Sequence, residues 1–189
     1  MSAAPTVIVL AAGRSERFRA ATGGQHKLQA RLGERPVLDH VLQAVRDSGL
    51  PWHVVQPAHT AQLTSAGMGD SIACGGRATD GSSGWLVLPG DLPLVRSDTL
   101  RAVAQALRTH DVVVPFYRDQ RGHPVGFGAR CRAGLLALQG DQGAQAVVRA
   151  WGAHRLEVED EGCVMDVDTP EALAQAHAVW RQRAEPNAR

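Results

Sequence analysis

Positively charged side chains and glycines are concentrated in residues 13–33. This stretch holds five basic residues against a single acid, Glu16, although the net charge of the whole chain is only +1. Arginine and lysine bind phosphate oxygens, and the amides of a glycine-rich loop can bind an anion together. The stretch predicts a triphosphate-binding site, with a solvated basic loop as the alternative. Its basic residues are Arg14, Arg17, Arg19, Lys27 and Arg31.

Carboxylates follow two later apolar runs. Asp91 comes directly after Gly90 at the end of one run, and Asp166 and Asp168 stand two residues apart near the C-terminus. Mg²⁺ binds one or two protein carboxylates together with substrate phosphates. Asp91 with one of the other two would therefore supply a magnesium site beside a triphosphate. A turn role for Asp91 and an N-cap role for Asp168 are the alternatives.

The glycine pattern differs from the two standard nucleotide fingerprints. The sequence contains no GxxxxGK[ST] motif, which argues against a P-loop NTPase. A dinucleotide-binding fold would have GxGxxG opening a helix directly, whereas here Gly13 stands alone before a long, irregular stretch.

The elements that must position these residues alternate between strands and helices. Short apolar runs rich in β-branched residues predict strands that are buried on both faces. The strands are expected at residues 6–12, 52–55, 84–89, 111–116 and 163–166, with an edge strand at 154–159. Residues 13–33 show no periodicity and are expected to form a long loop.

Apolar residues at helical spacing predict the intervening helices. One helix carries the apolar stripe of residues 37–45 and is ended by residues 49–51. Further helices are expected at residues 68–77, 98–107, 130–138, 143–151 and 170–183. Ser97 is the expected N-cap of the helix that begins at residue 98, and Pro170 suits a first helical turn.

This alternation predicts an α/β fold in which helices cover both faces of a mostly parallel sheet. Residues 118–122 predict the turn of a small β-hairpin excursion near residues 114–128. Ligands of open α/β sheets bind outside the carboxyl ends of the strands. The basic stretch and the two acidic corners are therefore expected at the same edge of the sheet.

Length and composition limit the class of protein. The 189 residues suit one domain with a substantial core, and residues 183–189 are expected to be a frayed tail. Aromatic residues make up only 4%, which argues against a base-stacking nucleic-acid module, and no apolar stretch approaches the ~20 residues that span a bilayer. Three scattered cysteines and the lack of a basic signal-peptide region indicate a cytoplasmic protein.

Seven motifs occur in the order seen in MobA-like NTP transferases, and the sequence most closely resembles the molybdenum cofactor cytidylyltransferases among them. The motifs are LAAGRSERF (10–18), KL (27–28), GMGDS (67–71), GDLPLV (90–95), RGHP (121–124), GDQGA (140–144) and DVDTPE (166–171). The opening motif is shared by many nucleotidyltransferases. Its combination with RGHP and GDQGA is narrower.

The resemblance implies a Rossmann-like three-layer fold in a single nucleotidyltransferase domain that uses Mg²⁺. It implies transfer of CMP from CTP to the molybdopterin Mo cofactor, with release of pyrophosphate. Ala12 favours CTP, because the guanylyl branch of the family has glycine at this position. A molybdenum hydroxylase apo-enzyme would be a downstream partner, and neither nucleic acid nor a membrane would be one.

The resemblance also implies a role for each matching residue. Arg17, Lys27 and Asp91 would be catalytic, with the two cations holding the triphosphate and stabilising the charge that develops at its α-phosphate. The nucleotide would contact Leu10, Ala11, Ala12, Gly13, Arg14, Ser71 and Gly90. The acceptor would contact Arg121, Gly122 and His123, with a turn role as the alternative for His123. The metal ion would be bound by Asp91, Asp166 and Asp168.

Two segments depart from the family pattern, and other functions stay open. Residues 19–23 lengthen the path from Phe18 to Lys27, and residues 56–66 are shorter than in relatives. A nucleotidyltransferase that uses GTP or another phosphorylated acceptor would suit the same residues. The short 56–66 segment motivates a non-catalytic Mo cofactor carrier or insertion chaperone. A nicotinamide-dependent dehydrogenase is the remaining alternative.

Overall fold

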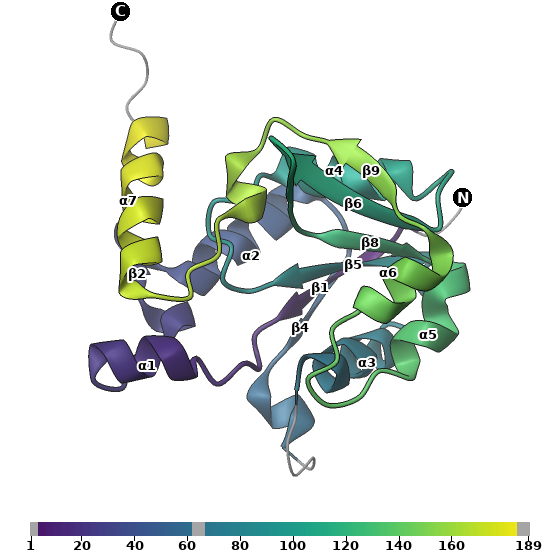
Figure 1. The fold of residues 1–189 in the computed structure, drawn as a ribbon, viewed down its shortest axis with the longest axis horizontal. Coiled ribbons are helices and arrows are strands. Elements are labelled where there is room, and N and C mark those ends of the chain that lie inside the picture. The colour runs from purple at the N-terminus through teal and green to yellow at the C-terminus, as the bar shows by residue number, and fades with distance from the viewer. Residues whose placement is uncertain (1–3, 62–66, 185–189) are drawn as a thin grey trace, which may run out of the picture.

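The computed structural model describes residues 4–61 and 67–184, which form a seven-stranded sheet with helices on both sides (Figure 1). The strand order is β4-β1-β5-β8-β6-β7, and β9 also pairs with β6. Strands β7 and β8 run opposite to the other five, so the prediction of a mostly parallel sheet is confirmed. The strands are β1 (Thr6–Leu10), β4 (Trp52–Val55), β5 (Gly84–Pro89), β6 (Val112–Tyr117), β7 (Gln120–Arg121), β8 (Val125–Gly128) and β9 (His154–Glu157).

The helices cover both faces because successive strand residues point to opposite sides of the sheet. In β1, Ile8 belongs to a buried cluster shared with α3, α5 and α6, whereas Val7 and Val9 belong to a second cluster shared with α2 and α4. The three-layer α/β fold is thereby confirmed. These helices are α2 (Val37–Ser48), α3 (Met68–Ala78), α4 (Ser97–Ala106), α5 (Arg132–Leu136) and α6 (Gln145–Trp151).

The expectation of a long loop over residues 13–33 is wrong. This stretch contains helix α1 (Glu16–Thr22), a 3-10 turn (Lys27–Gln29) and strand β2 (Arg31–Leu32), which pairs with β3 (Arg35–Pro36). The helix buries only Phe18, so it has no apolar stripe that a periodicity argument could detect. Gly23 ends it in a left-handed conformation at φ 69°, which glycine adopts without steric cost.

The strand expected at residues 163–166 is also wrong. Residues Glu161–Val164 form a 3-10 turn, and the chain then runs irregularly into α7 (Pro170–Ala184). The turn forms because Asp160 Oδ1 accepts a hydrogen bond from the Gly162 N–H at 3.0 Å. Asp166 and Asp168 therefore lie on a loop instead of a strand. Pro170 occupies the first turn of α7, as predicted.

Helix α4 begins differently from its prediction. Arg96, not Ser97, is the N-cap residue, and its own side chain caps nothing. The acceptor comes from the buried Asp160, whose Oδ2 receives the Arg96 N–H at 2.8 Å and the Thr99 hydroxyl at 2.7 Å. The cap is therefore supplied from 64 residues away along the chain, where no local motif could reveal it.

The remaining predictions near the sheet agree with the structure. The hairpin joins β6 to β7 through Arg118 and Asp119, both at positive φ, as two-residue hairpin turns require. Among the described strands, β9 pairs only with β6, as an edge strand does. The short 56–66 segment starts with a 3-10 turn, Pro57–Thr60, and residues 62–66 lie outside the described residues. So do residues 185–189 of the expected tail, whereas Arg183 is anchored by a hydrogen bond to the Leu94 carbonyl.

Among the described residues, no helix combines the length and the apolar character needed to cross a membrane.

Candidate active site

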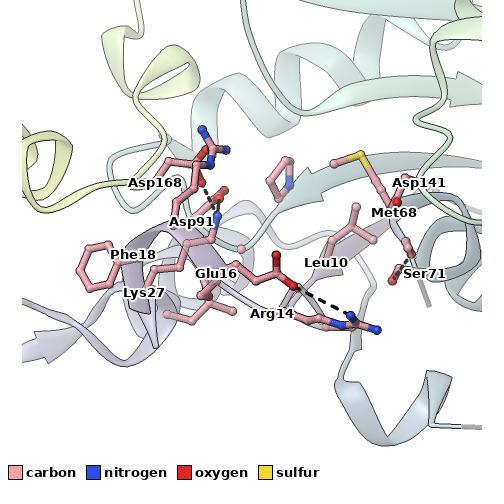
Figure 2. A pocket seen from close by; sticks show the side chains of 18 residues that line it. Leu10, Arg14, Glu16, Phe18, Lys27, Met68, Ser71, Asp91, Asp141 and Asp168 are labelled. Atoms are coloured by element: carbon pink, nitrogen blue, oxygen red, sulfur yellow. Dashed lines mark hydrogen bonds and ion pairs between the residues drawn. The ribbon is translucent and has the colours of Figure 1, made fainter. Parts of the chain in front are cut away.

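A cavity of about 450 Å³ lies at the carboxyl ends of β1 and β5. Figure 2 shows Asp91, Asp168 and Lys27 grouped at one end of it, and Met68, Ser71 and Asp141 at the other. We call it the charged cavity. Ten of the residues predicted for the site line it: Leu10, Ala12, Gly13, Arg14, Arg17, Lys27, Ser71, Gly90, Asp91 and Asp168. The structure thus brings the basic stretch and two of the acidic residues together at one edge of the sheet.

Lys27 is the centre of an ion-pair network in this cavity. Its Nζ donates to Asp91 Oδ2 and to Asp168 Oδ1, each at 2.5 Å. Arg17 donates to the second oxygen of Asp168. The side chains of Lys27, Asp91 and Asp168 are mostly buried, whereas Arg17 is exposed. Two cations and two carboxylates from three separate segments therefore balance one another.

This network sets the ionisation of its members. Burial alone would lower the pKa of Lys27, but the charge of Asp91 and the hydrogen bonds to both carboxylates outweigh burial and raise it. Burial alone would raise the pKa of Asp168, but its hydrogen bond and charge interaction with Lys27, together with the charge of Arg17, lower it. Lys27 is therefore an ammonium ion and Asp168 a carboxylate at neutral pH.

Local structure directs Lys27 into the cavity despite the longer 19–23 segment. Lys27 opens its 3-10 turn, and the preceding His26 accepts a hydrogen bond from the Leu28 N–H at 3.3 Å. The other ring nitrogen of His26 lies 2.9 Å from the Gly13 carbonyl, which ties the turn to the loop after β1. Leu28 is buried, so the neighbouring side chain of Lys27 faces the carboxylates.

The corner at Asp91 is held by backbone contacts on both sides. The Gly90 N–H donates to the Leu10 carbonyl at 2.9 Å, and a Cβ at Gly90 would meet that same oxygen at 2.9 Å. The Val167 N–H donates to the Asp91 carbonyl at 2.9 Å and brings the loop before α7 to the site. In that loop Thr169, not Asp168, caps α7 by accepting the Ala172 N–H. The side chain of Asp168 is therefore left for the cavity.

Asp91 and Asp168 are the carboxylates that could hold a metal ion. Asp91 Oδ1 is buried and has no hydrogen-bond partner among the described residues, so it offers a free ligand oxygen. Two carboxylates with substrate phosphates suit Mg²⁺. Asp166 is exposed, and thus only partly buried, and does not line the cavity; this partial burial together with the charges of Asp168 and Asp91 raises its pKa. Within residues 4–61 and 67–184, no group of three or more His, Cys, Asp or Glu side chains is arranged to hold a metal ion.

A second cavity of about 300 Å³ adjoins the first and shares Leu10, Met68 and Pro89 with it. We call it the apolar cavity, because aliphatic and aromatic side chains form most of its wall. Arg121 and His123 line it, and Arg121 donates to Gln145 Oε1 at 2.7 Å. The other lining residues are Ile72, Val87, Val125, Phe127, Gly143, Ala144 and Val148.

The predicted acceptor residues differ in what they contribute to the apolar cavity. Nδ1 of His123 is buried without a partner among the described residues, so it is available to a ligand. Burial lowers the pKa of His123, and the nearby charge of Asp91 offsets this only in part. Gly122 lines neither cavity; a Cβ there would lie 2.5 Å from Cys163 Sγ, so it allows close packing. Ala11, predicted to contact the nucleotide, is buried and lines neither cavity.

Sequence reasoning missed the role of Asp70, which joins two glycine loops beside the cavities. Asp70 Oδ2 accepts the N–H of Gly67 at 3.0 Å and that of Gly140 at 2.8 Å, so the two glycine loops are held together. Met68, the first residue of α3, and Asp141, which follows Gly140, line the charged cavity. Met68 and Asp70 belong to the GMGDS motif, and Asp141 belongs to the GDQGA motif. These two motifs were therefore the sequence signal that could have indicated these residues.

Comparisons with known proteins agree with this architecture. The MobA-like NTP transferase domain matches residues 7–158. The bifunctional protein GlmU of Pelobacter propionicus is 30% identical over 139 residues, which are 64% of this chain and 30% of that protein. The chain thus spans about a third of the length of the curated relatives it matches.

Solved structures show the same fold at low sequence identity. Rv0371c from Mycobacterium tuberculosis H37Rv has a TM-score of 0.75 at 24% identity, with 94% of this chain and 99% of that chain covered. The same protein has also been solved in complex with manganese, with a TM-score of 0.71 at 23% identity and coverage of 94% and 100%. Molybdopterin-guanine dinucleotide biosynthesis protein A from Archaeoglobus fulgidus has a TM-score of 0.62 at 16% identity, with coverage of 94% and 99%.

The match covers most of the chain, and the charged cavity lies at the strand ends where this fold binds its ligands. The protein belongs to the family of MobA-like NTP transferase domains.

Proposed function

We propose that the protein is a Mg²⁺-dependent nucleotidyltransferase that transfers CMP from CTP to the molybdopterin Mo cofactor. An oxygen of the acceptor's terminal phosphate would attack the α-phosphorus of CTP. The bond from that phosphorus to the bridging oxygen would break, and pyrophosphate would leave. The observation that carries the proposal is the meeting of Lys27 and Arg17 with Asp91 and Asp168 in one cavity.

The charged cavity supplies what this reaction needs. Phosphoryl transfer depends on positioning and on electrostatic stabilisation, and it requires no nucleophile from the protein. Arg17 and Lys27 would bind the phosphates and stabilise the charge that develops during transfer. The loop after Ala12 would offer its backbone amides to the nucleotide.

Asp91 and Asp168 would hold the metal ion, and Asp166 would stand beside them. The two carboxylates and the free Oδ1 of Asp91 fit a hard cation that takes its other ligands from phosphates. When bound, Mg²⁺ supplies charge neutralisation at the phosphates.

The apolar cavity suits a flat heteroaromatic acceptor such as a pterin. Its wall is mainly aliphatic, and Arg121, His123 and Gln145 are its polar side chains. A sugar would bury several hydroxyl groups against this wall without hydrogen-bond partners, which is costly. A pterin would place its ring faces on the apolar wall and its polar edge near the three polar side chains.

Another phosphorylated acceptor is the second candidate. The similarity to GlmU proteins and to a solved 4-diphosphocytidyl-2C-methyl-D-erythritol synthase from Anaerococcus prevotii, which has a TM-score of 0.70 at 16% identity, motivates it. The choice between CTP and GTP rests on Ala12, which lines the charged cavity. Calorimetric titration of both nucleotides with Mg²⁺ distinguishes them, and we expect CTP to bind more tightly.

The experiment that tests the function measures pyrophosphate. The protein is incubated with Mg²⁺, each nucleoside triphosphate and the Mo cofactor, and a parallel series contains a sugar phosphate in place of the cofactor. We expect release with CTP and the Mo cofactor. Release only with the sugar phosphate would favour the second candidate. Cofactor binding without any pyrophosphate would instead indicate a carrier or insertion chaperone.

A further inference from the structure

Lys27 occupies the position between the two carboxylates of the charged cavity. One Nζ contacts Asp91 and Asp168 at 2.5 Å each, and these two residues come from different loops. The ammonium group therefore links the two loops through their side chains, in addition to the backbone hydrogen bond from the Val167 N–H to the Asp91 carbonyl. A divalent ion bound by both carboxylates could use Asp91 Oδ1, which has no partner among the described residues, but both oxygens of Asp168 are already taken by Lys27 and Arg17.

The charges of the site favour exchange over simultaneous binding. Within the ion-pair network, the two carboxylates carry two negative charges, which Lys27 and Arg17 neutralise. The cavity also contains Arg14, Glu16 and Asp141, and Asp166 lies near Asp168. A divalent ion added to this balanced set would face two cations close by, and like charges at such distances repel strongly in a partly buried site. A triphosphate changes the balance, because it brings negative charges that the two basic side chains can contact.

The geometry allows the basic side chains to move to a nucleotide. Lysine has a flexible four-carbon stem, and only its terminal group is attached to the carboxylates. The side chain of Arg17 is 77% exposed, so little packing holds it against Asp168. Lys27 and Arg17 line the same cavity as the loop after β1. Asp91 Oδ1 keeps no partner of its own, so one ligand oxygen is available before any exchange.

We infer that Lys27 is an exchangeable internal cation that competes with the divalent metal ion for Asp91 and Asp168 until a nucleoside triphosphate draws it away. The inference rests on the proposed function, since it assigns an order of events to the same site. The metal ion alone binds weakly, and metal ion and nucleotide bind cooperatively. Removal of the Lys27 ammonium group has opposite effects on the two: it strengthens binding of the metal alone and abolishes the cooperativity.

The test titrates Mn²⁺ into the protein and follows free Mn²⁺ by electron paramagnetic resonance, with and without the non-hydrolysable analogue α,β-methylene-CTP. We expect the wild-type protein to bind Mn²⁺ at least ~10-fold more tightly when the analogue is present, as coupling free energies between linked sites commonly allow. We expect Lys27→Met to bind Mn²⁺ alone at least ~5-fold more tightly than the wild type, with no further gain from the analogue.

Two variants separate competition from a general change of charge. Lys27→Arg keeps a cation at the carboxylates, so its affinity for Mn²⁺ alone is expected to stay weak. Arg19→Met removes a positive charge from the same segment, but Arg19 contacts the Gly24 carbonyl and neither carboxylate. It is expected to leave the affinity for Mn²⁺ alone unchanged. An equal gain in Arg19→Met and Lys27→Met would overturn the inference.

A second measurement needs no substitution, because Lys27 is the only lysine in the sequence. Protein labelled with ¹⁵N-lysine gives one side-chain ammonium signal. We expect this signal to change little with Mg²⁺ alone and to shift when the analogue is added with Mg²⁺. A signal that stays in place with both ligands bound would overturn the inference. Failure of the analogue to bind in any titration would instead overturn the proposed function. The affinities of the wild type and Lys27→Met for Mn²⁺ without the analogue would still show whether Lys27 competes with the metal ion.

Discussion

The charged cavity and the apolar cavity share a wall but are built in different ways. The ion-pair network of the charged cavity stands on segments beyond the strand ends, such as the 3-10 turn that carries Lys27 and the corner after β5 that carries Asp91. The wall of the apolar cavity comes from within the sheet, such as Phe127 of β8, and from the helices on it, such as Val148 of α6. Loops can change their side chains without disturbing the core, whereas the apolar wall is itself part of the core.

This difference separates two tasks. In the proposed function, the charged cavity would supply charges for the triphosphate, which is common to all nucleoside triphosphates. The apolar cavity would supply shape and a few polar contacts that distinguish one acceptor from another. Chemistry and acceptor choice should therefore respond to different substitutions, and the loop contact at Gly67 should affect both.

The largest effect on activity is expected from Asp91→Asn, which would disrupt the ion-pair network of the charged cavity. The change removes a carboxylate that contacts Lys27 and would hold the metal ion, at nearly constant volume. We expect pyrophosphate release to fall by about 10²–10³-fold, as for removal of one electrostatic stabiliser from an active site. The rate is measured with saturating nucleotide, and circular dichroism checks the fold.

Asp98→Asn is the matched control for this prediction. Asp98 is exposed and pairs with Arg101 on α4. This variant is expected to keep its activity. If Asp91→Asn retained wild-type turnover, Asp91 would have no place in the mechanism.

Gly67→Ala is expected to weaken both cavities together. A Cβ at Gly67 would lie 2.2 Å from the backbone carbonyl of Gly140, so the two glycine loops would have to separate. We expect the free energy of unfolding to fall by about 1–3 kcal/mol, the usual cost of overpacking. Denaturant unfolding measures it, and Gly81→Ala, where a Cβ would meet nothing within 4 Å, is the control. Equal stability of the two variants would show that the loops do not need this contact.

Ala144→Leu is expected to affect acceptor binding but not nucleotide binding, because the larger side chain would fill the apolar cavity alone. Ala144 lines that cavity at the start of α6. We expect KM for the acceptor to rise by roughly 10-fold or more, as steric changes of this size do in apolar pockets, with the dissociation constant of the nucleotide unchanged. Ala146→Leu, at an exposed position of the same helix, is expected to change neither value. A weaker nucleotide affinity in Ala144→Leu would mean that the cavities do not bind separate ligands.

The smallest effect concerns pH and the Lys27–Asp168 ion pair. Because the pKa of Asp168 is lowered from 3.8, its contribution to stability is present above about pH 4 and is lost as the pH falls through the lowered value. Asp168→Asn lacks this contribution. Lys27 keeps its contact with Asp91 in this variant, and Arg17 is exposed. The difference in free energy of unfolding between wild type and variant should therefore be about 1 kcal/mol at neutral pH and should shrink in acid. A difference that grows in acid would contradict the assignment.

The charged cavity could be predicted in outline because its signals are local. A strand followed by glycines and basic residues, and an acid directly after a buried strand, are patterns within short windows of sequence. The topology of an open sheet then places strand ends together. Asp91 needed no more than this, and the structure places it beside Lys27. The wrong predictions arose where a local pattern was missing, as in α1, whose one buried residue is Phe18.

By itself, the sequence determined the α/β alternation, the edge of the sheet where the charged cavity lies and the charges available there, since each depends on neighbouring residues. Only the tertiary structure decided that Lys27 bridges Asp91 and Asp168, which lie 64 and 141 positions away. It also decided that Asp160 caps α4 and that apolar faces of β5, β8, α3 and α6 enclose a second cavity. These features depend on contacts between distant segments, whose partners are chosen by how the whole core packs.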